Sequence, residues 1–186
     1  NYDSVQLAHF DSAQTAVRYL QKMGHQRIAL LTTKTESTNT RDEKVGFMNA
    51  LVESGLSFAQ AEKSVFYEDM TYADGANFAN KFVREGYDFT ALYILSSEQC
   101  VGFVARFQQL GKKIPDDLSL IALNRVPMLL ETGTSITTLD QPSEEMGMKA
   151  VELLLKRAAN HTTGYTNVQY SATLQEGFST RKISLF

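Results

Sequence analysis

The sequence predicts an α/β fold in which helices flank a mostly parallel β-sheet. Short apolar runs such as 28–31 and 118–123 are typical of strands that are buried on both faces. Longer segments with apolar residues at helical spacing separate these runs. Strands and helices therefore alternate along the chain with short connections, an order that favours parallel strands joined by right-handed crossovers.

The first elements are a short strand at 5–8 and a helix that reaches residue 23, for which Asp11 and Ser12 are candidate caps. Gly24 suits the left-handed residue that often ends a helix. The later elements follow the same rule. We expect strands at 28–31, 64–67, 91–95, 118–123, 136–139 and 166–173, and helices at 40–54, 72–85, 101–110 and 143–158.

Composition excludes several classes of protein. A net charge of −3 gives no basic surface for nucleic acid or an anionic membrane. A single cysteine, Cys100, rules out an internal disulfide framework and fits a reducing compartment. No apolar run reaches the roughly 18 residues of a spanning helix, and the N-terminus lacks a signal pattern. We expect a cytoplasmic protein with one core and no membrane contact.

Patterns typical of enzymes are absent from the sequence. His9, His25 and His161 stand in no metal-ligand spacing, and neither a phosphate-binding loop nor a Gly-x-Ser-x-Gly sequence occurs. His25 is expected to contact the helix end that precedes it, and Cys100 is expected to be a packed core thiol. We therefore expect no catalytic residue, no metal and no cofactor.

The segment after the strand 28–31 is almost wholly polar from residue 32 to residue 40. Ligands of such sheets bind outside the carboxyl ends of the strands, where hydroxyl and amide groups suit a polyol. A solvated loop explains the same composition equally well. Thr40 and Glu43 also have the spacing of a capping box, so Glu43 has a structural explanation as well as a possible ligand role.

Four phrases resemble the effector-binding core of the lactose/galactose-repressor family of bacterial transcription regulators. They are Met-Gly-His-Gln-Arg-Ile-Ala-Leu at 23–30, Ile-Pro-Asp-Asp-Leu-Ser-Leu-Ile at 114–121, Ile-Thr-Thr-Leu-Asp-Gln-Pro at 136–142 and Glu-Met-Gly at 145–147. The resemblance runs from residue 4 to about residue 181. It implies one lobe of a type I periplasmic-binding-protein-like fold, in a repressor that binds a small, sugar-like effector between two lobes.

The resemblance also implies a division of the chain and a set of partners. Residues 1–139 are expected to form the effector-binding C-terminal lobe, 140–160 a crossover helix that packs on the first lobe, and 161–186 a returning strand and tail. The family places a DNA-binding headpiece and the first lobe ahead of this region, so DNA is expected to bind only there. A solute-binding protein of a transporter is the alternative, which the absent signal and the phrase at 115–119 disfavour.

Positions that contact the effector in the family have changed in this chain. The family's arginine, three residues before a Gly-Phe pair, is Glu43 here, and its aspartate after the strand 120–123 is Asn124. Its stacking aromatic residue aligns with Met70. By resemblance the ligand-binding residues are Asn39, Arg41, Glu43, Met70, Ser96 and Asn124. The resemblance therefore supports the fold more strongly than it identifies the ligand.

The resemblance further implies a homodimer. Its expected interface residues are Tyr72, Val101, Phe103, Met128, Leu129 and Leu130. The alternative is that these side chains pack in the core of their own lobe, which applies above all to Val101. The helix 143–158 carries the apolar residues Met146, Met148, Ala150, Val151, Leu153, Leu154 and Leu155. Without a first lobe to cover it, we expect this helix to dock on a second copy or to fold back onto its own sheet.

Overall fold

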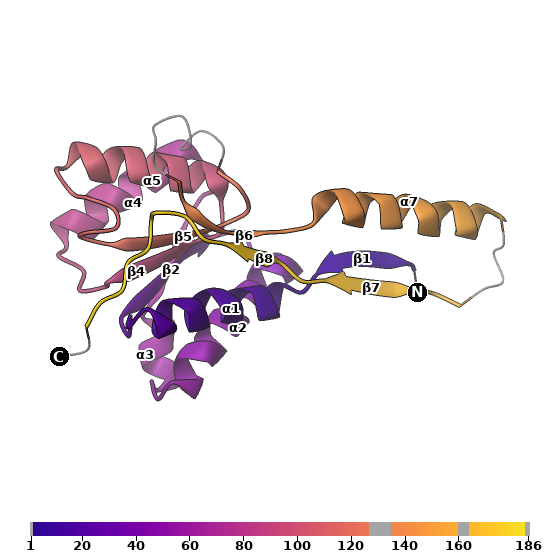
Figure 1. The fold of residues 1–186 in the computed structure, drawn as a ribbon, viewed down its shortest axis with the longest axis horizontal. Helices are drawn as coiled ribbons and strands as arrows, with labels where there is room; N and C mark the ends of the chain where they lie inside the picture. Colours follow the sequence, from indigo (N-terminus) through magenta and orange to yellow (C-terminus); the bar gives the residue numbers. More distant parts are fainter. Residues whose placement is uncertain (1, 127–134, 160–163, 185–186) are drawn as a thin grey trace.

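The computed structural model describes residues 2–126, 135–159 and 164–184. Its main body is a six-stranded sheet with the strand order β3-β2-β4-β5-β6-β8, in which only the pairing of β8 is antiparallel (Figure 1). The strands are β2 (Ile28–Thr33), β3 (Val65–Glu68), β4 (Ala91–Ile94), β5 (Ser119–Leu123), β6 (Thr137–Asp140) and β8 (Thr173–Gln175). The predicted α/β class is confirmed.

Helices cover both faces of this sheet. On one face lie α1 (His9–Lys22), α2 (Thr38–Glu53) and the short α3 (Phe58–Glu62), and on the other lie α4 (Tyr72–Arg84) and α5 (Ser97–Gln109) (Figure 1). Successive strand residues point to opposite faces, so Leu30 belongs to the core under α1 and α2 while Leu31 belongs to the core under α4 and α5. This double coverage explains why β2, β4 and β5 are buried throughout and mostly apolar.

Glycine allows the helices of each pair to approach closely. Gly46 of α2 lies against the Phe10 carbonyl oxygen of α1, and Gly102 of α5 lies against the Tyr72 carbonyl oxygen of α4. A Cβ atom at either glycine would overlap that backbone. The Gly46-Phe47 pair of the sequence therefore has a packing role, because Phe47 beside it is fully buried.

A second unit extends away from the main sheet (Figure 1). In it β1 (Ser4–Leu7) pairs in parallel with β7 (Asn167–Tyr170), and α7 (Ser143–Ala159) lies beside β1. In this position Leu153 of α7 is buried, and Arg157 Nε is 2.9 Å from Asp3 Oδ2. The helix therefore packs on β1, and the expectation that it folds back onto the main sheet is wrong.

Several expected boundaries differ from the structure. The strand expected at 166–173 is two strands, β7 and β8, which belong to different sheets, and β1 lies outside the sheet of the expected lobe 1–139. The helix α1 begins at His9 without a side-chain cap, so Asp11 and Ser12 lie inside it. The capping box of α2 joins Ser37 to Thr40, one turn before the expected pair. In the described ranges, no helix is both long and apolar enough to cross a membrane.

Candidate functional site

The carboxyl ends of five parallel strands meet at one edge of the main sheet, the edge that carries ligands in folds of this type. A cavity of about 380 Å³ lies there, between the main sheet and β1. Pockets for small molecules usually have volumes in this range. The residues that line it are Val5, Gln6, Leu7, His9, Asn39, Leu123, Asn124, Gln141 and Met146.

The polar part of this lining consists of His9 and four side-chain amides. Gln6, Asn39, Asn124 and Gln141 present carboxamide groups, each of which offers both donors and an acceptor. The remaining lining residues are apolar. Such a combination matches a ligand with several hydroxyl groups and some exposed carbon surface.

Asn124 lies at this edge, at the carboxyl end of β5. It follows β5 directly and adopts a left-handed conformation with φ of 67°, which asparagine tolerates better than most residues. Its backbone N–H donates to the Leu139 carbonyl oxygen at 2.9 Å. The side-chain Oδ1 is buried and has no hydrogen-bond partner among the described residues. A buried acceptor of this kind is costly unless a ligand or a water molecule donates to it.

Glu43 lies behind the cavity wall and not in it. Its side chain is buried, with Oε1 3.0 Å from His9 Nδ1 and Oε2 accepting a hydrogen bond of 3.1 Å from the Tyr93 hydroxyl. The capping-box interpretation of Glu43 is therefore wrong, because Ser37 and Thr40 form that box. Glu43 instead ties α2 to the first turn of α1 and to β4.

Burial raises the pKa of the Glu43 carboxyl, while the hydrogen bonds from His9 and Tyr93 oppose that rise. Burial, with Glu43 beside it, places the pKa of the Tyr93 hydroxyl well above its usual range. Tyr93 therefore stays protonated and donates to Glu43.

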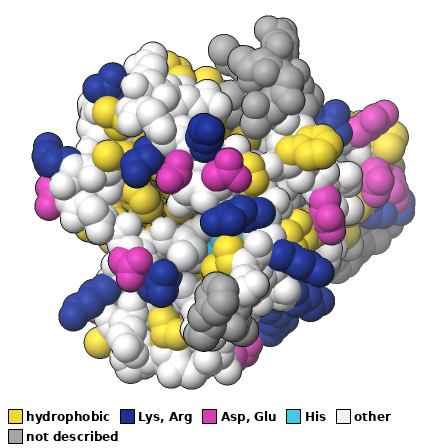
Figure 2. Space-filling view, turned by 60° about the vertical axis from the view of Figure 1, so that its left-hand side comes forward, with side chains coloured by type: hydrophobic (Ala, Val, Ile, Leu, Met, Phe, Trp, Pro, Cys, Tyr) yellow, Lys and Arg dark blue, Asp and Glu magenta, His cyan; other side chains and the backbone are white. Residues whose placement is uncertain are grey.

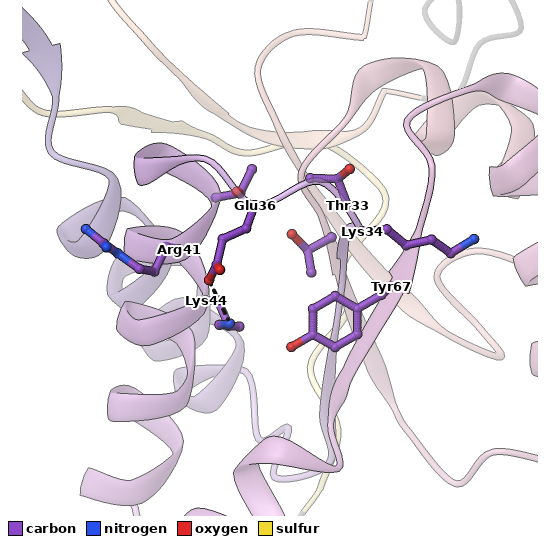
Figure 3. Close-up of a pocket in the computed structure, with 8 residues that line it drawn as sticks. Thr33, Lys34, Glu36, Arg41, Lys44 and Tyr67 are labelled. Atoms are coloured by element: carbon purple, nitrogen blue, oxygen red, sulfur yellow. Dashed lines mark hydrogen bonds and ion pairs between the residues drawn. The ribbon is translucent and has the colours of Figure 1, made fainter.

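Arg41 lines a different, smaller hollow of about 130 Å³ beside α2 and β3. Figure 3 shows Arg41 and Lys34 directed to opposite sides, while Lys44 faces Glu36 at 3.4 Å. Lys34 pairs with Glu68 at 3.2 Å instead. Of the predicted ligand residues, the cavity at the sheet edge thus brings together Asn39 and Asn124 but not Arg41.

Met70 and Ser96 also lie outside the lining of that cavity. Ser96 is the cap of α5, where its hydroxyl accepts from the Gln99 amide at 3.3 Å and donates to the Met70 carbonyl oxygen at 3.2 Å. The Met70 side chain is exposed. Ser96 therefore has a structural role that joins the ends of β3 and β4.

The predicted dimer residues have different surroundings. Tyr72 is exposed, and Val101 is half-buried and packs against the core under α4 and α5. Phe103 has no exposed surface and stacks on Phe107 with ring centroids 5.1 Å apart. The prediction that Phe103 forms an interface is therefore wrong, because its side chain is enclosed in its own chain. Met128, Leu129 and Leu130 lie outside the described residues.

Two other residues have structural roles. Cys100 is buried, as predicted, and burial raises the pKa of its thiol to about 12. The ring of His25 is also buried, but its partners are the Thr90 hydroxyl at 2.9 Å and the Arg181 carbonyl oxygen at 3.1 Å. Contrary to expectation, the side chain of His25 does not hydrogen-bond to the end of the preceding helix. Only its backbone N–H does, by donating to the Leu20 carbonyl oxygen.

Seven of the nine residues that line this cavity were not predicted from the sequence, namely Val5, Gln6, Leu7, His9, Leu123, Gln141 and Met146. Gln141 lies in the phrase at 136–142, which the sequence analysis used only for the family resemblance. Within the described ranges, no group of three or more His, Cys, Asp or Glu residues is placed to hold a metal ion.

The surface charge is mixed. On the face shown in Figure 2, the Lys and Arg side chains of the described residues are interspersed with Asp and Glu, without a continuous basic area. This distribution agrees with the net charge of −3.

Comparisons with known proteins agree with this architecture. A model of the family described as periplasmic binding protein-like domain matches residues 17–180. The chain is 27% identical over 179 residues to catabolite control protein A of Priestia megaterium, which covers 96% of this chain and 53% of that protein. It is 23% identical over 155 residues to the HTH-type transcriptional repressor PurR of Photobacterium profundum, and the match covers 83% of this chain and 46% of that repressor.

Among solved structures, a LacI family transcriptional regulator from Enterococcus faecium with bound ribose has a TM-score of 0.87 and 23% identity to this chain. That likeness covers 98% of this chain and 66% of the other, and it concerns the fold.

The fold and the cavity at the strand ends are those of a periplasmic-binding-protein-like core. The chain belongs to the periplasmic binding protein-like domain family, and the predicted resemblance to the lactose/galactose-repressor regulators is confirmed. It spans about half the length of the curated relatives it matches. These relatives are transcription regulators and not enzymes.

Proposed function

We propose that this chain is the ligand-sensing core of a DNA-binding transcription regulator of the repressor type. Its effector is a small polar molecule, sugar-like in chemistry, as in the ribose-bound relative. The cavity between the main sheet and β1 carries this proposal, because Asn124 aims a buried, unpartnered acceptor at that edge.

The connections between the two units support a sensing role. The cavity takes lining residues from β1, from the start of α1 and from the segment between β6 and α7. All of these lie where the chain passes from one unit to the other. A ligand bound there contacts both units at once, so it favours the arrangement in which they are closest.

The proposal extends to the remaining partners and to the site. The working protein is a cytoplasmic homodimer that contacts no membrane and binds DNA through a separate N-terminal domain, as in the family. Asn39 and Asn124 contact the effector directly, and Glu43 acts from behind His9. The regulator relatives favour this function over the solute-binding protein of a transporter.

The test uses the intact protein as its organism makes it. A pool of random DNA duplexes is selected for retention by the protein, with and without each of a panel of sugars that raise its melting temperature. We expect one enriched sequence whose retention changes at least about tenfold with one sugar, the range of typical allosteric coupling. A sugar that binds while no DNA sequence is ever enriched would instead indicate a transport protein.

A further inference from the structure

His9 holds a position in the cavity that its own sequence context does not reveal. It is the first residue of α1, and its ring forms part of the cavity wall, with most of the side chain covered. Its Nδ1 is engaged by Glu43 at 3.0 Å. No described residue bonds its other nitrogen, Nε2, so this atom remains for a ligand.

The group behind His9 fixes how the ring is presented. Glu43 Oε1 lies 3.0 Å from His9 Nδ1, and an ionised carboxylate only accepts hydrogen bonds, so with Glu43 ionised Nδ1 is the donor. The second oxygen of Glu43 accepts a hydrogen bond from the Tyr93 hydroxyl, and Tyr93 is fully buried in the core. The ring of His9 is therefore held from behind through a chain of two hydrogen bonds.

The charges around the cavity disfavour an anionic ligand. Among the described residues that line it, none is Lys, Arg, Asp or Glu. Glu43 lies behind one wall, and in the adjoining cavity of about 530 Å³ Asp140 has a buried Oδ1 without a partner. The nearby Arg125 is already paired with Asp140 at 3.3 Å, and its side chain is largely exposed.

From this arrangement we infer that the cavity selects an uncharged polyhydroxylated effector over its phosphorylated counterpart, and that His9 determines this specificity. Its Nε2 bonds an effector hydroxyl. Glu43 is the positioning residue that presents the ring. The inference rests on the proposed function and deepens it, because it states the chemical class of the effector.

Binding experiments test the ligand class. The melting temperature and the dissociation constant of the protein are measured with uncharged mono- and disaccharides, including D-ribose and D-glucose, and with D-ribose 5-phosphate, D-glucose 6-phosphate and inorganic phosphate at equal ionic strength. We expect at least one uncharged sugar to bind, and its phosphate ester to bind at least about tenfold more weakly. A phosphorylated sugar or phosphate that binds as tightly, or a panel without any uncharged binder, overturns the inference.

Variants test the two named residues. His9→Asn retains a donor near the position of Nδ1 but loses Nε2, so we expect affinity for the bound sugar to fall about tenfold, the effect of one lost hydrogen bond. His9→Gln places an amide near the position of Nε2 and is expected to restore part of that loss. Equal affinity in His9→Asn and the unaltered protein overturns the role of His9.

The positioning role of Glu43 has a readout that needs no ligand. Nitrogen NMR shifts of the histidine rings report which ring nitrogen carries the proton, and the His9 signals are identified by their loss in His9→Asn. We expect Glu43→Gln to change the His9 shifts, because an amide both donates and accepts. The matched control is Glu53→Gln, which removes the Arg18–Glu53 pair between the same two helices, far from the cavity, and leaves those shifts unchanged. Unchanged shifts in Glu43→Gln overturn the positioning role.

These outcomes separate the inference from the proposed function. A phosphorylated sugar that binds and alters DNA retention leaves the regulator intact and overturns only the ligand class. An uncharged sugar that binds through His9, without any effect on DNA, supports the inference and contradicts the regulator.

Discussion

At the scale of single residues, Asn124 combines two demands that ordinarily fall on different residues. Its backbone needs a left-handed conformation at the end of β5, and its side chain places an unpartnered acceptor at the cavity. Alanine satisfies neither demand, whereas glycine satisfies only the first. The two substitutions therefore separate the backbone role from the ligand role.

We expect Asn124→Ala to lower the free energy of unfolding by about 1 kcal/mol, the usual cost of a left-handed residue without glycine or asparagine. Asn124→Gly should retain most of that stability. Both variants should weaken effector binding, since both lack the amide. Urea unfolding and calorimetric binding check the two parts, and normal binding by Asn124→Gly would show that the amide has no ligand role.

His25 gives the protein a dependence on pH. Burial is the main cause that lowers the pKa of its imidazole below the usual 6.5, so the folded protein binds fewer protons there than the unfolded chain does. Stability that depends on the neutral ring is therefore present above pH 6.5 and is lost as the pH falls below it.

We expect His25→Gln to be less stable than the unaltered protein at pH 7.5, because the contacts with Thr90 and Arg181 weaken. The difference in free energy of unfolding should shrink steadily below pH 6.5. Urea unfolding of both proteins from pH 7.5 to pH 5 measures this difference. The raised pKa of Glu43 gives stability a pH dependence of the opposite sign, but Glu43 is present in both proteins, so its contribution cancels. A difference that stays constant over this range would contradict the lowered pKa.

At the scale of elements, the helix pairs depend on glycines that permit backbone contact. Gly75 and Gly102 each lie against the backbone of the facing helix, at Gln99 and Tyr72 respectively. The backbone there belongs to rigid helices, so neither side yields easily. An added methyl group forces α4 and α5 apart and disturbs the aromatic core beneath them.

We expect Gly102→Ala to lower the free energy of unfolding by about 1–3 kcal/mol, the typical cost of overpacking. The matched control is Gly147→Ala in α7, where no atom lies within 4 Å of the added carbon. There the better helix propensity of alanine should leave stability unchanged or raise it by up to about 1 kcal/mol. Chemical denaturation of both variants compares them, and equal effects would contradict the packing argument.

The elements were predictable where a local pattern determines them. The strands 28–31 and 91–95 and the helices after them follow from apolar spacing that needs no knowledge of the rest of the chain. The capping box of α2 could not be predicted in this way, because the pair Ser37 and Thr40 has the same spacing as the pair Thr40 and Glu43. The burial of Glu43 beside His9 and Tyr93 decides between them, and that contact joins distant parts of the sequence.

The same limit applies to the candidate site. Asn39 and Asn124 could be predicted, because the carboxyl ends of parallel strands always share one edge. His9 could not, since its place on the cavity wall depends on how α1 packs against α2. The strand expected at 166–173 also looked continuous, because alternation does not show where a chain passes from one sheet to another.

At the scale of the whole molecule, α7 is the helix whose apolar side chains are least covered by the rest of the chain. Leu153 is buried against the small sheet, and Met146 packs on the main core. The outward side of the helix exposes Met148, Val151, Leu154 and Leu155, with exposed fractions of 56–67%. Their spacing of three and four residues makes them one continuous apolar stripe. Stripes of this kind normally contact another protein surface.

We therefore expect the 186-residue chain to associate with itself through α7 at high concentration. The double variant Leu154→Glu with Leu155→Glu should remove most of this association, as measured by sedimentation velocity over a range of concentrations. Its melting temperature should hardly change, because both side chains are about two-thirds exposed in the single chain. Phe58→Glu is the control, since Phe58 is equally exposed but lies on α3, away from the stripe. A chain that stays monomeric at every concentration, or a control that acts as strongly as the double variant, would show that the stripe does not drive association.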